Sequence, residues 1–175
     1  MLSKSLKFAK DGSVVVTDSK LARLFQSFTD ESDRGLVVIV GTILEEKLGR
    51  ILKEILIQKK ESDALVDRNL SGFEARAKAA YCIGAISRCE YGMIEAIRRI
   101  RNDFAHQFVT DDFDGRLESK KAQVMDALAK FLPGYDRESF PSVRKAFEAF
   151  AVSIVTELWD REHELDKSDY IHERE

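Results

Sequence analysis

Apolar residues recur at helical spacing along most of the chain, and this pattern predicts an all-α protein. Residues 19–28 place Leu21, Leu24, Phe25 and Phe28 on one helical face. The next helix is predicted from about residue 33 to 58, and its first half, LVVIVGTIL, is apolar almost all round, so other helices must enclose it. Further helices are predicted over about residues 71–86, 87–106, 115–132 and 140–164.

Capping and turn signals divide the chain further. Ser71 with Glu74 and Ser87 with Glu90 match the S-x-x-E capping box, which predicts a helix start at each. The polar stretch 58–69 is predicted to be a connection with at most one helical turn. Asp11-Gly12 lies between two short β-prone runs, which indicates a hairpin. We therefore expect a hairpin in residues 1–17, a bundle of about five to six helices in 18–164, and a charged tail in 165–175.

Composition restricts the function classes. The 175 residues fit one domain, and a formal charge of −3 with 34 % charged residues gives no general attraction to nucleic acid. No stretch reaches the ~20 apolar residues of a membrane span, and the N-terminus lacks a signal-peptide core, so a cytoplasmic protein is predicted. The spacing of Cys82 and Cys89 is not that of a zinc site. Another possible metal site, at His163 and Glu164, lies in a charged segment that is predicted to be a solvated face. Neither a metal nor a cofactor is expected.

The octet RNDFAHQF at residues 101–108 carries the densest candidate chemistry. On a helical wheel an apolar stripe is formed by Met93, Ile97, Ile100 and Phe104. Arg101 lies on the same side of the helix as this stripe and its apolar flanks. An inward guanidinium needs a buried acceptor. Asp33 or Glu31, in the segment ESDRG, is the first candidate for that acceptor, with Arg34 beside them at a helix N-terminus, where anions are favoured.

Two interpretations of this helix stay open. Arg98, Asn102 and His106 form a row one turn apart beside the inward Arg101. In a structural role, Arg101 pairs with a carboxylate of another helix and His106 caps the helix end. In a catalytic role, His106 is the general acid/base and Arg101 stabilises a phosphate in flight, with no metal required.

Three motifs together resemble the mannitol operon repressor family of bacterial proteins. They are ESDRG, LSGFEARAKAAYCIGAIS and EYGMIEAIRRIRNDFAH, and the resemblance covers about residues 30 to 110. It implies an all-helical transcriptional regulator without a recognisable DNA-reading element. The chain likewise has no helix-turn-helix with a basic recognition helix, so direct DNA binding is not favoured. We expect action through a protein partner, with self-association as a homodimer.

The segment RNDFAH is also similar to the Arg-Asn-x-x-x-His signature of HEPN domains, small helical bundles that include dimeric metal-independent ribonucleases. This resemblance implies an active-site set of Arg101, Asn102 and His106, with Asp33 or Glu31 as a supporting acid. It also implies two copies of the motif facing each other across a dimer interface. Several HEPN proteins are inactive binding or scaffolding proteins. An endoribonuclease acting on RNA is therefore the alternative function, and Asp33, Arg34, Arg98 and Asn102 are the candidate binding residues.

Overall fold

The computed structural model describes residues 6–8, 14–16, 18–56, 59–106, 117–131 and 140–167, and seven α-helices lie within them. The all-α prediction is confirmed. Short 3₁₀ turns precede α2 and α6, at Phe28–Asp30 (η1) and Leu117–Lys120 (η4), and a π-helical turn follows α3 at Leu65–Asn69 (η2). The helices are α1 (Ser19–Ser27), α2 (Asp33–Ile55), α3 (Lys59–Ala64), α4 (Phe73–Cys82), α5 (Arg88–His106), α6 (Lys121–Phe131) and α7 (Val143–Lys167).

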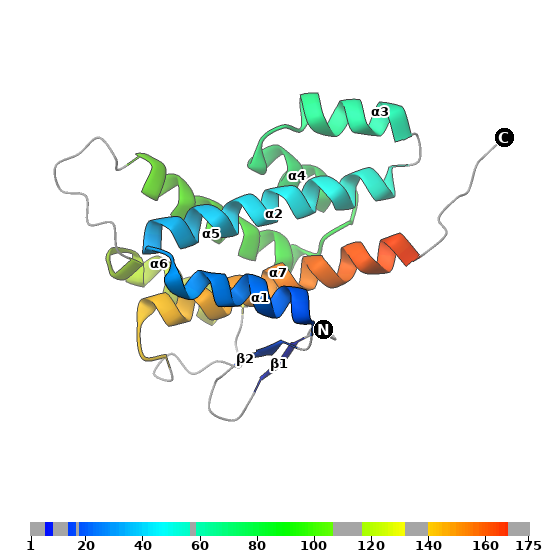
Figure 1. Ribbon diagram of the computed structural model, residues 1–175. Coiled ribbons are helices and arrows are strands. Elements are labelled where there is room, and N and C mark those ends of the chain that lie inside the picture. Colours follow the sequence, from blue (N-terminus) through cyan, green and yellow to red (C-terminus); the bar gives the residue numbers. More distant parts are fainter. Residues whose placement is uncertain are drawn as a thin grey trace.

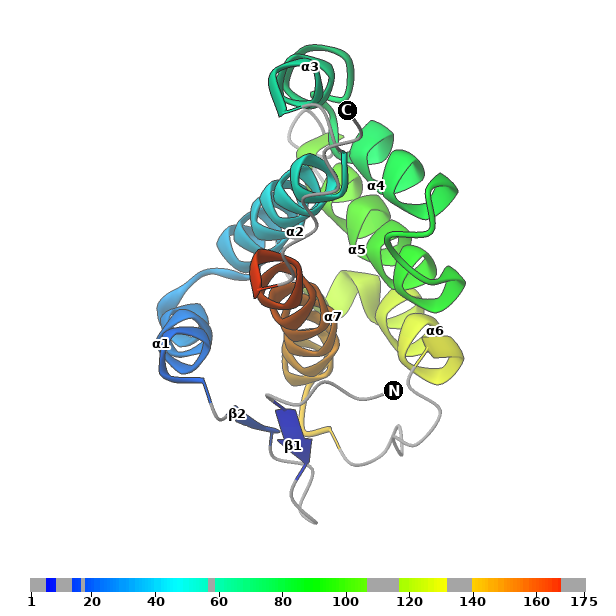
Figure 2. The same ribbon diagram turned by 90° about the vertical axis from the view of Figure 1, so that its right-hand side faces the viewer.

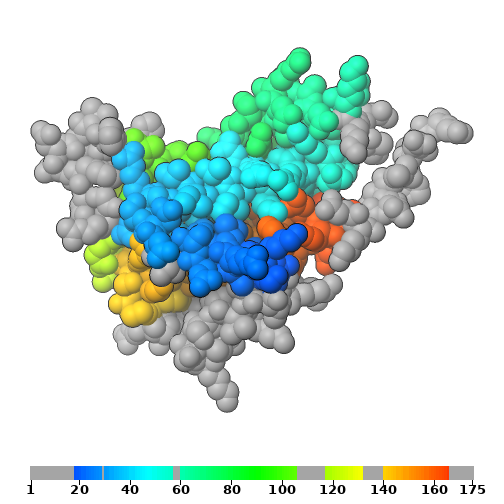
Figure 3. Space-filling model, viewed as in Figure 1, coloured from blue at the N-terminus to red at the C-terminus, as the bar shows by residue number. Residues whose placement is uncertain are grey.

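Helix α2 is the centre of the bundle (Figure 1). It packs most extensively against α7, and then against α4 and α5. Figure 2 shows α1 on one side of the α2–α7 pair, with α4, α5 and α6 on the other. In the space-filling view α1 and α2 form the front surface (Figure 3). The predicted enclosure of the apolar half of α2 is only partly correct: Leu36, Val37, Val40 and Leu44 are buried, but Val38 is 41 % exposed, on a face that α2 turns to solvent.

The predicted stripes of α5 and α7 also face the core. Buried residues of α5 and α7 are Met93, Ile97, Ile100, Phe104, Phe147, Phe150, Ile154 and Leu158. Trp159 is only partly buried, at the edge of the same cluster. Large apolar side chains at this spacing are each worth about 1.5–3 kcal/mol when fully buried, so these two helices supply much of the core around α2.

Some predicted boundaries are wrong. Residues 59–69 are helical, as α3 and the π-helical turn, where at most one turn was expected, and this adds a helix to the predicted five to six. Helix α4 ends at Cys82 instead of continuing to residue 86, because the chain turns at Gly84, whose φ of 75° favours glycine. Tertiary contacts decide such ends as much as local propensity does.

Capping side chains begin several helices. The Ser87–Glu90 box at α5 is confirmed: the Ser87 amide donates to the Glu90 carboxylate (2.6 Å) and the Glu90 amide to the Ser87 hydroxyl (3.2 Å). The box at Ser71 is not formed, since Gly72 is the N-cap of α4 and has no side-chain cap. Ser32 caps α2 by accepting from the Gly35 amide (3.0 Å).

Helix α1 begins at a carboxylate cap. The Asp18 side chain accepts from the Lys20 and Leu21 amides, at 2.8 and 3.0 Å. The hydrogen bond from the Leu21 amide is the main reason that the pKa of Asp18 is lowered. The cap therefore needs the ionised carboxylate, and its contribution is lost as the pH falls through that lowered pKa.

The chain ends are described only in part. β1 (Leu6–Phe8) and β2 (Val14–Val16) pair antiparallel, with Leu6 opposite Val16. The predicted Asp11-Gly12 turn lies outside the described residues, as do residues 168–175 of the predicted tail. Helix α7 continues to Lys167, past the predicted end at 164. None of the helices in the described ranges is both long and apolar enough to cross a membrane.

A buried ion pair joins α2 to the end of α7. The Lys47 ammonium pairs with the Glu162 carboxylate, and both side chains are more than nine-tenths buried. Arg50 reaches the other carboxylate oxygen of Glu162 at 3.2 Å, and the Lys47 nitrogen lies 3.9 Å from the centroid of the Trp159 ring. The two longest helices are thus joined by a charged contact within an apolar interface.

We expect Glu162→Ala to lower the free energy of unfolding by about 3 kcal/mol, because it leaves the Lys47 ammonium buried without its carboxylate. The double variant Lys47→Met/Glu162→Leu should recover most of this loss, since it leaves no charge unpaired. Urea unfolding followed by circular dichroism measures both. A double variant no more stable than Glu162→Ala would contradict the explanation.

Candidate functional site

The Arg101 side chain packs against Gly41 of α2, in the space that a larger side chain would fill. We call this space the Gly41 seat. A Cβ added at Gly41 would stand 2.6 Å from Cδ of Arg101 and 3.2 Å from its Nε, so no larger residue fits there without moving the arginine. The guanidinium carbon lies 5.8 Å from the centroid of the Phe73 ring on α4. Arg101 therefore crosses the interface between three helices instead of projecting freely from α5.

The acceptor of Arg101 is Glu45 of α2, with Nη1 3.5 Å from Oε2. The two side chains are 30 % and 23 % exposed, so the pair lies at the edge of the bundle, partly open to solvent. The prediction of a carboxylate from another helix is correct, but the choice of Asp33 or Glu31 is wrong. Arg101 is level with Gly41, about 12 Å along α2 from Asp33 at 1.5 Å per residue. Glu31 instead places its carboxylate beside Gly35.

A second arginine repeats this arrangement two turns further along α2. A Cβ at Gly49 would lie 3.1 Å from Nη1 of Arg76, which comes from α4. The same Nη1 donates to the Glu45 backbone carbonyl (3.1 Å), and Nε donates to the Leu70 carbonyl (2.8 Å). Gly41, Glu45 and Gly49 thus form one row of α2, at i, i+4 and i+8, that receives two arginines.

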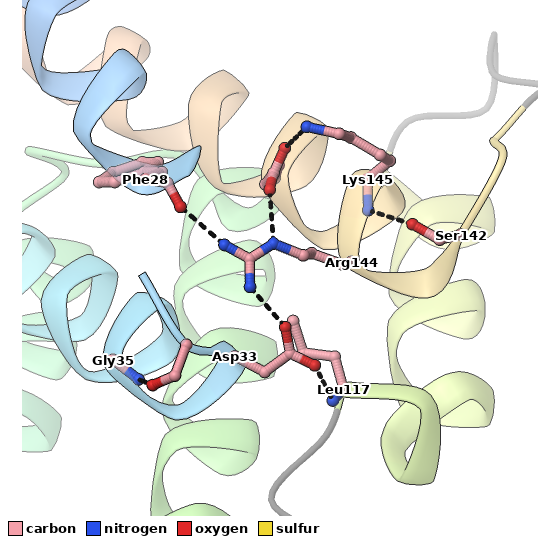
Figure 4. A network of polar contacts seen from close by, with 9 residues as sticks. Phe28, Asp33, Gly35, Leu117, Ser142, Arg144 and Lys145 are labelled. Atoms are coloured by element: carbon pink, nitrogen blue, oxygen red, sulfur yellow. Dashed lines mark hydrogen bonds and ion pairs between the residues drawn. The ribbon is translucent and has the colours of Figure 1, made fainter. Parts of the chain in front are cut away.

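Asp33 belongs to a different network, around Arg144 of α7 (Figure 4). Nη1 of Arg144 lies 2.6 Å from Oδ1 of Asp33, and the Leu117 amide donates to Oδ2 (2.7 Å). Arg144 also donates to the Phe28 carbonyl (2.7 Å) and to Glu148 (3.0 Å). Burial alone would lower the pKa of Arg144, but its hydrogen bonds to Asp33 and Glu148 outweigh this and raise it. Asp33 therefore connects α2, η4 and α7.

The row predicted on α5 consists of Arg98, Asn102 and His106, and the structure describes the first two side chains. Arg98 donates to both carboxylate oxygens of Glu95, at 2.8 and 2.9 Å, and lies 3.3 Å from Glu74. The hydrogen bond to Glu95 is the main cause that raises the pKa of Arg98. Asn102 is half-buried one turn further on. His106 is the last residue of α5, and its side chain lies outside the described residues.

The structure places Asp33 apart from the arginines of α5. Arg98 and Arg101 lie near each other on α5, each with its own carboxylate, whereas Asp33 is committed to Arg144. Arg34 is half-buried in the first turn of α2 and has an interaction of its own. Within the described ranges, no three metal-ligating side chains gather.

Sequence reasoning missed Glu45 and Arg144. A usable signal was present, because Gly41, Glu45 and Gly49 lie four residues apart on one face of the predicted helix. In the structure arginine side chains fill the space beside both glycines.

Comparisons with known proteins add nothing to this geometry. No family model, no curated protein and no solved structure matches the chain. The two family resemblances of the sequence therefore stay predictions.

We expect Gly41→Ala to lower the free energy of unfolding by about 1–3 kcal/mol, because the new methyl group overlaps the middle of the Arg101 side chain. In an Arg101→Ala background the same change should be stabilising, by up to about 1 kcal/mol, since alanine is the better helix former. A double-mutant cycle by chemical denaturation measures the coupling. Equal effects of Gly41→Ala in both backgrounds would contradict the packing of the Arg101 side chain against Gly41.

Proposed function

We propose that the chain is a non-catalytic cytoplasmic regulator of the kind represented by the mannitol operon repressor family. It acts through contacts with a partner protein and self-associates as a homodimer. The proposal rests on the sequence motifs and on one observation: Arg98 and Arg101, the two arginines nearest the RNDFAH segment that face α4 and α2, are occupied by contacts inside the bundle.

That observation concerns the segment on which both resemblances depend. Arg98 is held by two carboxylates, Glu95 and Glu74, and Arg101 by Glu45 and the Gly41 seat. A cation that already has a carboxylate partner must lose it before it can bind a phosphate, and this weakens any gain from the new contact. The arrangement favours an architectural role for these arginines over a role in binding a nucleic acid backbone.

A metal-independent ribonuclease of the HEPN type is the second candidate. It is favoured by the exposure of the Arg101 side chain, 30 %, and by the 3.5 Å length of its ion pair, which is longer than a strong charge-assisted hydrogen bond. Such an arginine can turn toward a phosphate that approaches from solvent. In this alternative His106 is the general acid/base and Arg101 stabilises the developing charge.

A ribonuclease assay in EDTA separates the two candidates. We expect no cleavage of a mixed RNA pool by the wild type or by His106→Ala, because the regulator needs no turnover. Thermal unfolding of each variant serves as the folding control. Cleavage by a wild type that both Arg101→Ala and His106→Ala abolish, with the fold retained, would replace the regulator by the nuclease.

A reporter assay tests the regulatory role directly. In a bacterial host without its own mannitol operon repressor, expression of the chain should lower output from a mannitol operon reporter, and His106→Ala should repress as well as the wild type. The purified chain should not retard the operator duplex at modest salt, since DNA contacts would give steeply salt-dependent binding. Unchanged reporter output, or retardation that falls with salt, would reject action through a protein partner.

A further inference from the structure

An open groove of about 840 Å³ runs between α5 and α6. Its α5 side extends from Arg88 to Ile100 and its α6 side from Gln123 to Phe131. At 1.5 Å per residue, these segments are about 18 and 12 Å long, or about three and two helical turns. The groove is lined by the residues around Arg99, whereas Arg98 and Arg101 face α4 and α2.

The floor of the groove is made of small and apolar residues. Gly92 and Ala96 of α5 lie opposite Ala127 of α6, and the ring of Phe131 rests against Gly92, where a methyl group would overlap it. The Phe131 ring fills the space beside Gly92, and the small side chains of Ala96 and Ala127 leave room along the rest of the floor for the ridge of a third helix. The floor therefore suits an apolar helical face better than a polar ligand.

Three basic side chains lie beside this floor. Arg88, Arg99 and Lys130 are exposed, and no carboxylate among the described residues forms an ion pair with any of them. The two acidic residues that line the groove are already engaged: Glu95 is held by Arg98, and Asp126 has an interaction of its own. The positive charge of α5 that has no ion pair among the described residues is therefore concentrated at this groove, where the Lys130 nitrogen of α6 also lies 5.0 Å from the centroid of the Phe131 ring.

An apolar edge continues the groove at the start of α5. Tyr91 lines the groove and stacks on Tyr81 of α4, with ring centroids 4.8 Å apart. Tyr81 and the following Ile83 are 39 % and 47 % exposed, two of the most exposed large apolar side chains in the described part of the chain. The surface thus combines an apolar channel, an apolar edge and free cations.

We infer that this groove binds an acidic amphipathic helix of a partner protein, an inference that rests on the proposed regulatory function. The apolar face of such a helix packs on the floor, and its glutamates or aspartates pair with Arg88, Arg99 and Lys130. Nucleic acid fits less well, because Tyr81 already covers one face of the Tyr91 ring, which leaves that face unavailable for stacking on a base.

The first experiment uses a fluorescein-labelled helical peptide of leucine and glutamate, with leucine at i, i+3, i+4 and i+7, in fluorescence polarisation. Arg88→Glu/Arg99→Glu should weaken its binding at least about tenfold, since two attractive charges become repulsive. The matched control, Lys20→Glu/Arg23→Glu, changes the net charge equally but lies on α1, across the bundle (Figure 2). It should bind within about twofold of the wild type, where remote charges are screened.

A neutral peptide with glutamine for every glutamate separates charge from simple hydrophobic adhesion, and it should bind at least about tenfold more weakly than the acidic peptide. Equal binding of the two peptides, or equal losses in the two charge-reversal variants, would overturn the inference. So would a single-stranded RNA oligonucleotide that binds more tightly and displaces the peptide. Dimer dissociation in Arg88→Glu/Arg99→Glu by sedimentation would assign the groove to a second copy instead.

A cysteine in the groove provides an independent readout. Cys89 lines the groove and Cys82 lies outside it, and both thiols are free and exposed. In a Cys82→Ser variant, saturating acidic peptide should slow alkylation of Cys89 by iodoacetamide. The peptide with glutamine for every glutamate should protect Cys89 less at the same concentration. Unchanged alkylation of Cys89 in the presence of saturating acidic peptide would place the peptide elsewhere.

The reporter distinguishes this inference from the function on which it rests. Loss of repression in a folded Arg88→Glu/Arg99→Glu variant, with repression retained in Lys20→Glu/Arg23→Glu, is the result expected. Normal repression by the groove variant would reject the groove and leave the regulator in place. A wild type that binds the acidic peptide but never represses would reject the regulator and leave the groove as a peptide site.

Discussion

Burial of α2 is the constraint on which the rest of the structure depends. Most of its apolar residues lie on the faces that α7, α4 and α5 cover, so all three neighbours are needed to bury them. Each fully buried leucine or valine contributes about 1.5–3 kcal/mol. The orientation of α5, and therefore of its own arginines, follows from the apolar stripe that it turns toward α2.

Charged side chains pack against α2 at a few positions, each with a partner of its own. Gly41 and Gly49 each leave space for an arginine, from α5 and α4. Glu45 between them forms an ion pair with Arg101 through its carboxylate and accepts a hydrogen bond from Arg76 through its backbone carbonyl. Lys47 meets Glu162 on another side of the same helix. A buried charge without a partner is costly, so these pairs also restrict how the surrounding helices can be arranged.

Helix α5 consequently has two basic faces with different surroundings. Arg98 and Arg101 are paired with carboxylates of neighbouring turns and helices, whereas Arg88 and Arg99 border the groove beside α6 without an ion pair among the described residues. The RNDFAH segment drew attention to the first face. The second face carries the free charge, and it could not be identified from the sequence because every arginine of α5 looks alike until its neighbours are placed.

The sequence by itself determined most of the helices, though not α3, and the cap of α5, since these depend on residues three or four positions apart. The stripe from Met93 to Phe104 and the Ser87–Glu90 box are both present in the structure. It also showed that Arg101 needed a carboxylate. Only the tertiary structure decided which one, Glu45 and not Asp33, because the level at which α5 crosses α2 depends on packing among α2, α4, α5 and α7, which no local spacing records.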